Sequence, residues 1–149
     1  MAAERAPDVE QLVRELLRAY QTGDVETISR YTSSDPAAML VGSDAREVAR
    51  GHDDIVSMIR GDIEHQRPES PRWSPEEIEA YREGDVAWAT MLGPYSIGDS
   101  PIPARALGVF RRENGDMKVV AWVFSFAVPN EALEPGSPVL ERLAAMAPH

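Results

Sequence analysis

The chain has 149 residues, of which 43% are hydrophobic and none is cysteine. A chain of this length can bury a core without disulfides or a structural zinc, and cysteine is excluded as a nucleophile, metal ligand or redox switch. The 15 basic and 25 acidic residues give a formal net charge of −10, which would repel a phosphate backbone. We therefore expect no nucleic-acid partner.

The N-terminal sequence continues into a charged segment rather than a signal-peptide core, and no apolar run reaches the length of a membrane helix. These features predict a cytoplasmic protein that has no membrane partner. We find neither an internal repeat nor a linker long enough to separate two domains. The sequence thus predicts one domain over residues 1–149, with its core in residues 8–131.

The N-terminal part predicts a hairpin of two helices. Apolar residues in 8–21 recur at spacings of three and four, which is typical of an amphipathic helix, and Gly23 ends it. A shorter helix after Asp24 carries Val25, Ile28 and Tyr31 on one side. Residues 38–41 and 46–50 then predict two short strands, and a third helix follows Gly51 and ends before Pro68.

The second half predicts an antiparallel meander. After a proline-rich connector at 68–75, extended periodicity marks strands at 76–82, 86–95, 104–112 and 117–128, with a wide loop at 98–103. Helices followed by a meander favour an α+β fold, with three N-terminal helices packed in the concave face of a strongly bent antiparallel sheet. A short C-terminal helix at 138–147 completes the predicted elements.

The last strand is apolar at both alternating sets of positions. Trp122, Phe124 and Phe126 share one parity, whereas Val119, Ala121 and Val123 share the other. Because helices cover only one face of the sheet, the bulkier set is expected on the outer face, where a second copy would cover it. We therefore predict a homodimer through that face. The alternative is that the C-terminal helix folds back over the same aromatic residues.

Several weak motifs occur in a familiar order. They are Met39-Leu-Val-Gly-Ser-Asp44, Glu47 and Gly51 before a helix, Gly84-Asp-Val-Ala-Trp88, and the segment 117–131. Over residues 8–131 this order resembles the SnoaL-like branch of the nuclear transport factor two-like superfamily. The resemblance implies a cone-shaped α+β fold around a pocket, commonly dimerised through the outer sheet face. It does not imply one activity, because the superfamily includes isomerases, epoxide hydrolases, cyclases, dehydratases and pockets without known chemistry.

Relatives often carry a histidine two residues before the serine of the final strand, where it enters the cavity. Here Val123 precedes Phe124 and Ser125, so the resemblance gives no such base. The three histidines lack metal-ligand spacing, and the sequence has no glycine-rich phosphate loop. We therefore expect neither a metal nor a cofactor.

Four residues are weak catalytic candidates. Tyr20 and Tyr31 lie on the inner stripes of the first two helices, so each hydroxyl either enters a pocket or reaches a carbonyl at its rim. His52 is either a base or a capping group in contact with solvent. Arg105 either clamps a carboxylate or lies along the surface. No aspartate falls at an inward position of a predicted strand.

Two hypotheses follow. The first is a carrier or binding domain for a small hydrophobic or aromatic molecule, without cofactor. The second is a cofactor-independent isomerase, polyketide cyclase or dehydratase that uses tyrosine with His52 or an acidic residue for proton transfer. The missing base at Val123 favours the first. Its expected ligand-binding residues, including Thr90 and Ser125 as hydrogen-bonding groups, are Tyr20, Tyr31, Met39, Trp73, Trp88, Thr90, Phe110, Val123 and Ser125.

Overall fold

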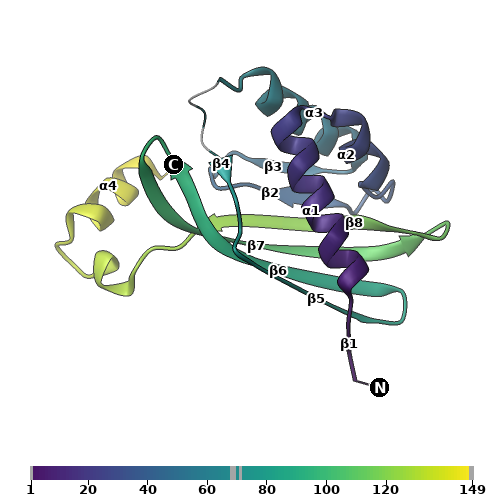
Figure 1. Ribbon diagram of the computed structural model, residues 1–149. Coiled ribbons are helices and arrows are strands. Elements are labelled where there is room, and N and C mark those ends of the chain that lie inside the picture. The colour runs from purple at the N-terminus through teal and green to yellow at the C-terminus, as the bar shows by residue number, and fades with distance from the viewer. Residues whose placement is uncertain (1, 68–69, 71, 148–149) are drawn as a thin grey trace.

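The computed structural model describes residues 2–67, 70 and 72–147, so parts of the predicted connector, residues 68, 69 and 71, lie outside the described residues. Three helices lie together over one face of a long, bent sheet, and a fourth stands apart beyond the end of the sheet (Figure 1). The predicted α+β architecture is confirmed. Of the helices in the described part of the chain, none is long and apolar enough to cross a membrane.

The helices form where the apolar periodicity predicted them: α1 (Pro7–Thr22), α2 (Val25–Tyr31) and α3 (His52–Glu64). Gly23 ends α1 in the left-handed conformation, with a φ of 77°, which a residue with a side chain adopts at a cost. Asp24 then caps α2 by accepting a hydrogen bond from the Thr27 amide at 3.0 Å. One glycine and one cap therefore make the turn of the helix hairpin.

The sheet has the strand order β1-β5-β6-β7-β8-β2-β3, and β4 pairs with β6 outside this path. All pairs are antiparallel except β2 with β8, which run parallel. The strands are β1 (Glu4–Arg5), β2 (Met39–Val41), β3 (Val48–Arg50), β4 (Arg72–Trp73), β5 (Glu77–Glu83), β6 (Val86–Ile97), β7 (Ser100–Glu113) and β8 (Asp116–Phe126).

The prediction of a wide loop at 98–103 is wrong, because β6 and β7 continue to a tight turn in which Ile97 pairs with Ser100. Pro101 and Pro103 suggested a loop because proline cannot donate to a sheet. This part of β7 pairs only with β6, since β8 joins β7 from Ala104 onward. A strand with one free edge tolerates proline, so the hairpin extends beyond the rest of the sheet.

A β-bulge in β8 overturns the predicted orientation of the last strand. Val119 pairs with Phe110 and Ala121 pairs with Val109, so Val120 is an extra residue without a partner on β7. The extra residue reverses the alternation, because Met117 and Val119 point inward before it and Trp122 does so after it. Trp122, Phe124 and Phe126 therefore pack against the core on the concave side and cannot form the outer face.

The core lies between α1 and the concave face of the sheet. Phe110 and Met91 are its largest fully buried side chains, and they meet the apolar stripe of α1, including Val9 and Val13. On β6 and β7 the inward positions are mostly small, with Ala87, Ala89, Ala104 and Ala106 buried there. Small residues at these positions let the helices approach the sheet closely.

The C-terminal segment leaves the sheet after Phe126 and forms the short 3-10 helix η1 (Asn130–Leu133) and α4 (Pro138–Met146). Its main contacts are between α4 and η1, and α4 buries none of its residues. Figure 1 shows α4 beyond the sheet rather than over it. The alternative in which this helix covers the aromatic residues of β8 is therefore wrong.

Candidate functional site

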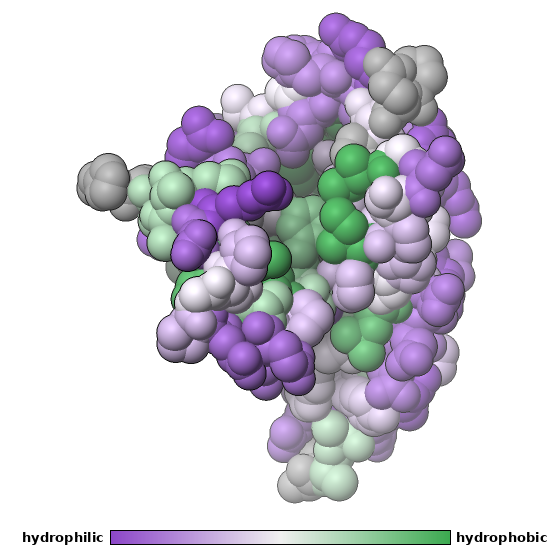
Figure 2. Space-filling model, turned by 90° about the vertical axis from the view of Figure 1, so that its left-hand side faces the viewer, coloured by the Kyte–Doolittle hydropathy of each residue, from purple (hydrophilic) through white to green (hydrophobic). Residues whose placement is uncertain are grey.

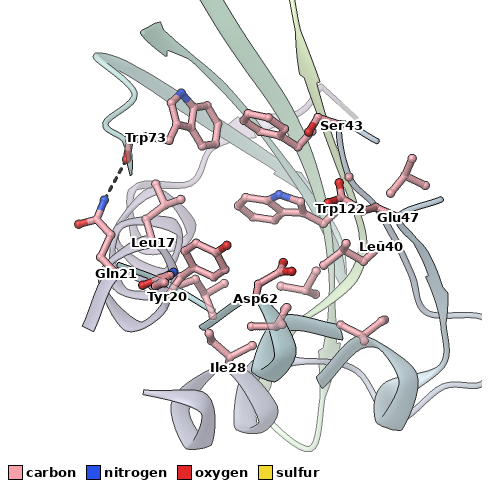
Figure 3. Close-up of a pocket in the computed structure, with 18 of the residues that line it drawn as sticks. Leu17, Tyr20, Gln21, Ile28, Leu40, Ser43, Glu47, Asp62, Trp73 and Trp122 are labelled. Atoms are coloured by element: carbon pink, nitrogen blue, oxygen red, sulfur yellow. Dashed lines mark hydrogen bonds between the residues drawn. The ribbon is translucent and has the colours of Figure 1, made fainter. Parts of the chain in front are cut away.

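A cavity of about 250 Å³ lies between the helices and the concave face of the sheet. Its lining comes from α1, α2, α3, β2, β4, β6 and β8, so it lies where the helical layer and the bent sheet diverge. Figure 2 views this side of the molecule and shows apolar atoms gathered in a hollow among hydrophilic ones. The close-up in Figure 3 shows side chains from these elements converging on the cavity.

Aromatic side chains form one wall of the cavity. The ring of Trp73 packs edge-on against Phe124 with centroids 5.0 Å apart, and Tyr95 lies 5.5 Å from the same ring. The indole nitrogen of Trp73 donates to the Gly93 carbonyl at 3.2 Å, and its own carbonyl accepts from Gln21 at 2.9 Å. Both ends of Trp73 are therefore held, which fixes this wall of the cavity.

Two carboxylates interrupt the apolar lining. Asp62 comes from α3, and Glu47 from the segment between β2 and β3. In Figure 3 the hydroxyl of Tyr20 and the carboxylate of Asp62 both extend into the cavity beneath the indole of Trp122. A β-carbon added at Gly42 would lie 2.2 Å from Oε2 of Glu47, so the absence of a side chain at Gly42 makes room for this carboxylate.

The surroundings of the cavity shift the pKa values of these groups. Burial raises the pKa of Asp62, and the negative charge of Glu47 adds to the shift while His65 opposes it. Burial also raises the pKa of Tyr20 to about 12, with a further contribution from Asp62. Burial raises the pKa of Tyr95 as well, followed by Glu47. The tyrosine hydroxyls are therefore protonated donors at neutral pH.

Three of the predicted ligand-binding residues, Tyr20, Met39 and Trp73, line the cavity. Tyr31 does not, because its ring lies at the end of α2 beneath the guanidinium of Arg30, 5.1 Å from the ring centroid. Phe110 is fully buried in the core, where it fills space without reaching the cavity. The side chains of Tyr31 and Phe110 therefore point inward as predicted, but each lies at a point along its helix or strand that does not reach the cavity.

The other predicted residues lie on the outer face of the sheet. Trp88 and Thr90 alternate with the buried Ala87, Ala89 and Met91, so their side chains point away from the helices. The bulge at Val120 places Val123 and Ser125 on this face as well, and Val123 is 42% exposed. The lack of a histidine at Val123 therefore says nothing about the cavity.

Arg105 is exposed on the same outer face of the sheet, in a shallow groove with Leu92 and Pro94, among other residues.

His52 lies outside the cavity, where it joins α3 to α2. Its Nε2 lies 3.0 Å from the Ser29 carbonyl, and its Nδ1 lies 3.0 Å from a carboxylate oxygen of Asp53. Both partners are acceptors, so both ring nitrogens donate only when the ring is a cation. The Asp53 carboxylate, followed by the Ser29 carbonyl, raises the pKa of His52 above its ordinary value of 6.5.

Replacing His52 with glutamine is expected to reduce thermal stability more at low pH than at high pH. A pKa raised in the folded state means that the stabilisation is complete below the unfolded value near 6.5 and is lost as pH rises through the folded value. The check is the difference in Tm between the two proteins from about pH 5.5 to 8.5. A difference that stays constant over this range would show that the cationic ring contributes nothing.

Sequence reasoning missed both carboxylates of the cavity. Asp62 follows Ile55, Met58 and Ile59 at helical spacing, so it occupies an inward position of α3. A polar residue on an apolar stripe was therefore a usable signal. Glu47 had no such signal, because its position depends on the β2–β3 turn and on the space at Gly42. The described residues contain no group of three or more potential metal ligands.

A family model described as a SnoaL-like domain matches residues 9–129. Among solved structures, an NTF2-like protein of unknown function from Pseudomonas putida KT2440 is 17% identical, with a TM-score of 0.73 over 86% of this chain and 90% of that one. A protein from Streptomyces avermitilis, provisionally named a dehydratase of the NTF2-like family, is 19% identical, with a TM-score of 0.69 over 83% and 100% of the two chains.

A cystatin-like fold protein from Burkholderia xenovorans LB400 is 22% identical, with a TM-score of 0.62 over 86% of this chain and 100% of that one. At these identities the likeness shows a shared fold. No curated protein matches the chain. Sequence and structure comparisons thus agree on one fold family.

Proposed function

This chain belongs to the SnoaL-like domain family, and from its cavity we propose that it binds a small, mainly apolar molecule whose polar end reaches Asp62 and Glu47. The cavity carries the proposal, because a concave, mostly apolar site with a few convergent polar groups is the usual form of a small-molecule site. Its volume of about 250 Å³ favours a small ligand.

A thermal-shift screen with aromatic polyketides, terpenoids and steroids tests binding. Replacing Leu17 with tryptophan is the matched control, since Leu17 lines the cavity and a larger side chain there would fill it. A ligand that occupies the cavity is expected to raise the Tm of the original protein and to leave the variant unchanged. Equal shifts in both proteins would place the binding outside the cavity and would contradict the proposal.

A second candidate function is proton transfer to or from the bound molecule. It is supported by a carboxyl group of raised pKa in an apolar cavity, close to a tyrosine that is protonated at neutral pH. Asp62 would accept or donate the proton, and Tyr20 would donate a hydrogen bond to the developing charge. His52 has no part in this scheme, because it joins α2 to α3 outside the cavity.

The test for proton transfer is exchange of ligand hydrogens with solvent deuterium, followed by NMR with ligands from the screen that contain a ketone. We expect exchange at carbon next to the carbonyl with the original protein and with His52→Gln, and none above background with Asp62→Asn. Binding without exchange in the original protein would leave a carrier or binding domain.

The homodimer stays a prediction, with its contact residues revised. The outer face of the sheet carries exposed apolar side chains on three adjacent strands, at Leu92 of β6, Leu107 of β7 and Val123 of β8. Leu107 is 43% exposed and pairs directly with Val123 in the sheet. Exposed apolar side chains gathered on one face favour contact with another copy through the same surface.

Replacing Leu107 with arginine is expected to convert a dimer into a monomer, because each copy would bury an unpaired charge in the contact. Light scattering coupled to size-exclusion chromatography measures the mass. Ser57→Arg is the control, since Ser57 is exposed on α3, away from the sheet. A monomer in the original protein at micromolar concentration would contradict the dimer.

A further inference from the structure

The two carboxylates of the cavity lack the partners that other acidic side chains of this protein have. Arg111 bonds both Asp35 and Glu113, at 2.9 Å and 2.8 Å. Among the described residues, no ion pair involves Asp62 or Glu47, although both line the cavity. Neither carboxylate is therefore neutralised by an ion pair within the described part of the chain.

Glu47 is held in place for such a role. One of its carboxylate oxygens accepts from the Asp44 amide at 3.0 Å, and Gly42 leaves the space that the side chain occupies. The charge of Glu47 acts on Asp62, Tyr20 and Tyr95, which come from three different elements around the cavity. Glu47 thus adds a negative charge to the lining of the cavity.

The aromatic rings suit the same ligand chemistry. Trp73, Tyr95 and Trp122 all line the cavity, and the faces of such rings attract cations. Arg67 and Arg72 also line it, but among the described residues neither pairs with Asp62 or Glu47, and Arg67 donates to the carbonyl of Gln66. Arg67 lies on the connection from α3 to β4 and Arg72 is the first residue of β4, whereas Asp62 and Tyr20 extend into the cavity in Figure 3.

We propose that the cavity binds an organic cation, with the apolar part of the molecule against Trp73 and Trp122 and an ammonium group at Asp62 and Glu47. This inference rests on the proposed binding function and specifies its ligand class. A cation would relieve the repulsion between the two carboxylates and form charge-assisted hydrogen bonds with them. An anion would add to the repulsion, and a neutral apolar molecule would remove water from the carboxylates without replacing it.

The experiment compares three ligands of similar shape: 2-phenylethylammonium, 2-phenylethanol and phenylacetate. Binding is followed by tryptophan fluorescence, since Trp73 and Trp122 line the cavity. We expect the cation to bind roughly tenfold or more tightly than the alcohol, as a charge-assisted contact allows, and phenylacetate to bind most weakly. Asp62→Asn is expected to remove most of the preference for the cation over the alcohol.

Asp54→Asn is the matched control, because it removes one negative charge from the same helix at an exposed position in the first turn. It should keep the preference for the cation. Equal affinity of the original protein for the cation and the alcohol, or a preference that survives Asp62→Asn and Glu47→Gln together, would overturn the cation proposal and leave the binding function intact. Failure of all three ligands, together with failure of the wider screen, would overturn both.

Discussion

Deletion of Val120 is expected to prevent the protein from folding to its native structure. Without the extra residue, the side chains of β8 would alternate between inward and outward without interruption from Met117. The residues on one side of the present bulge would then have to move to the opposite face of the sheet. Turning over the C-terminal side would expose Trp122, Phe124 and Phe126 and direct Ser125 inward. Burial of large aromatic side chains contributes roughly 1.5–3 kcal/mol each. The expected loss, on the order of 5 kcal/mol, is comparable to the total stability of a domain.

Val120→Ala is the control for this deletion, because it keeps the extra residue and removes only part of a half-buried side chain. We expect near-native circular dichroism and elution volume for Val120→Ala, and loss of near-ultraviolet signal or aggregation for the deletion. A deletion variant that folds with native stability would mean that the bulge can move along β8 at little cost. The orientation of the three aromatic residues would then depend on something other than Val120.

Replacing Gly93 with alanine is expected to lower the free energy of unfolding by about 2 kcal/mol. A β-carbon at Gly93 would lie 2.6 Å from the Glu76 amide nitrogen and 2.7 Å from Cα of Pro75, so two backbone segments would have to separate. The same segment carries Trp73, whose indole donates to the Gly93 carbonyl. The variant is therefore also expected to weaken ligand binding by displacing one wall of the cavity.

Gly61→Ala is expected to change the free energy of unfolding in the opposite direction. Gly61 lies within α3, and a β-carbon there meets nothing within 4 Å. Alanine in a helix interior is more favourable than glycine by roughly 0.5–1 kcal/mol, so this variant should be slightly more stable. Urea unfolding of both variants measures the two differences. Equal effects of the two substitutions would show that the contact between Gly93 and the 75–76 backbone does not restrict the fold.

The helical half was predictable because its apolar residues recur at one clear period. Val9, Leu12, Val13 and Leu16 mark the buried face of α1, and the structure buries all four. The same period places Asp62 at an inward position of α3, so this carboxylate could also have been predicted.

In the sheet half, the positions of the strands were predictable, but the face of the sheet to which each side chain points was not. In β8 both alternating sets of residues are apolar, so nothing in 119–126 indicates that Val120 is unpaired. The prediction therefore assigned Trp122, Phe124 and Phe126 to the outer face, whereas they pack against the core. A bulge is a property of two paired strands, and the sequence of one strand does not contain it. Glu47 was missed for a related reason, since its direction depends on a turn and on the space left at Gly42.

The attachment of α4 implies that this chain unfolds in two steps of unequal free energy. Its main contacts are with η1, and it buries no residue, so opening of this segment breaks few contacts and none in the core. Amide hydrogens of α4 should then exchange with solvent far faster than those of β6, β7 and α1, whose exchange reports global unfolding. Proteolysis would accordingly remove the C-terminal segment first and leave the cavity with its lining complete.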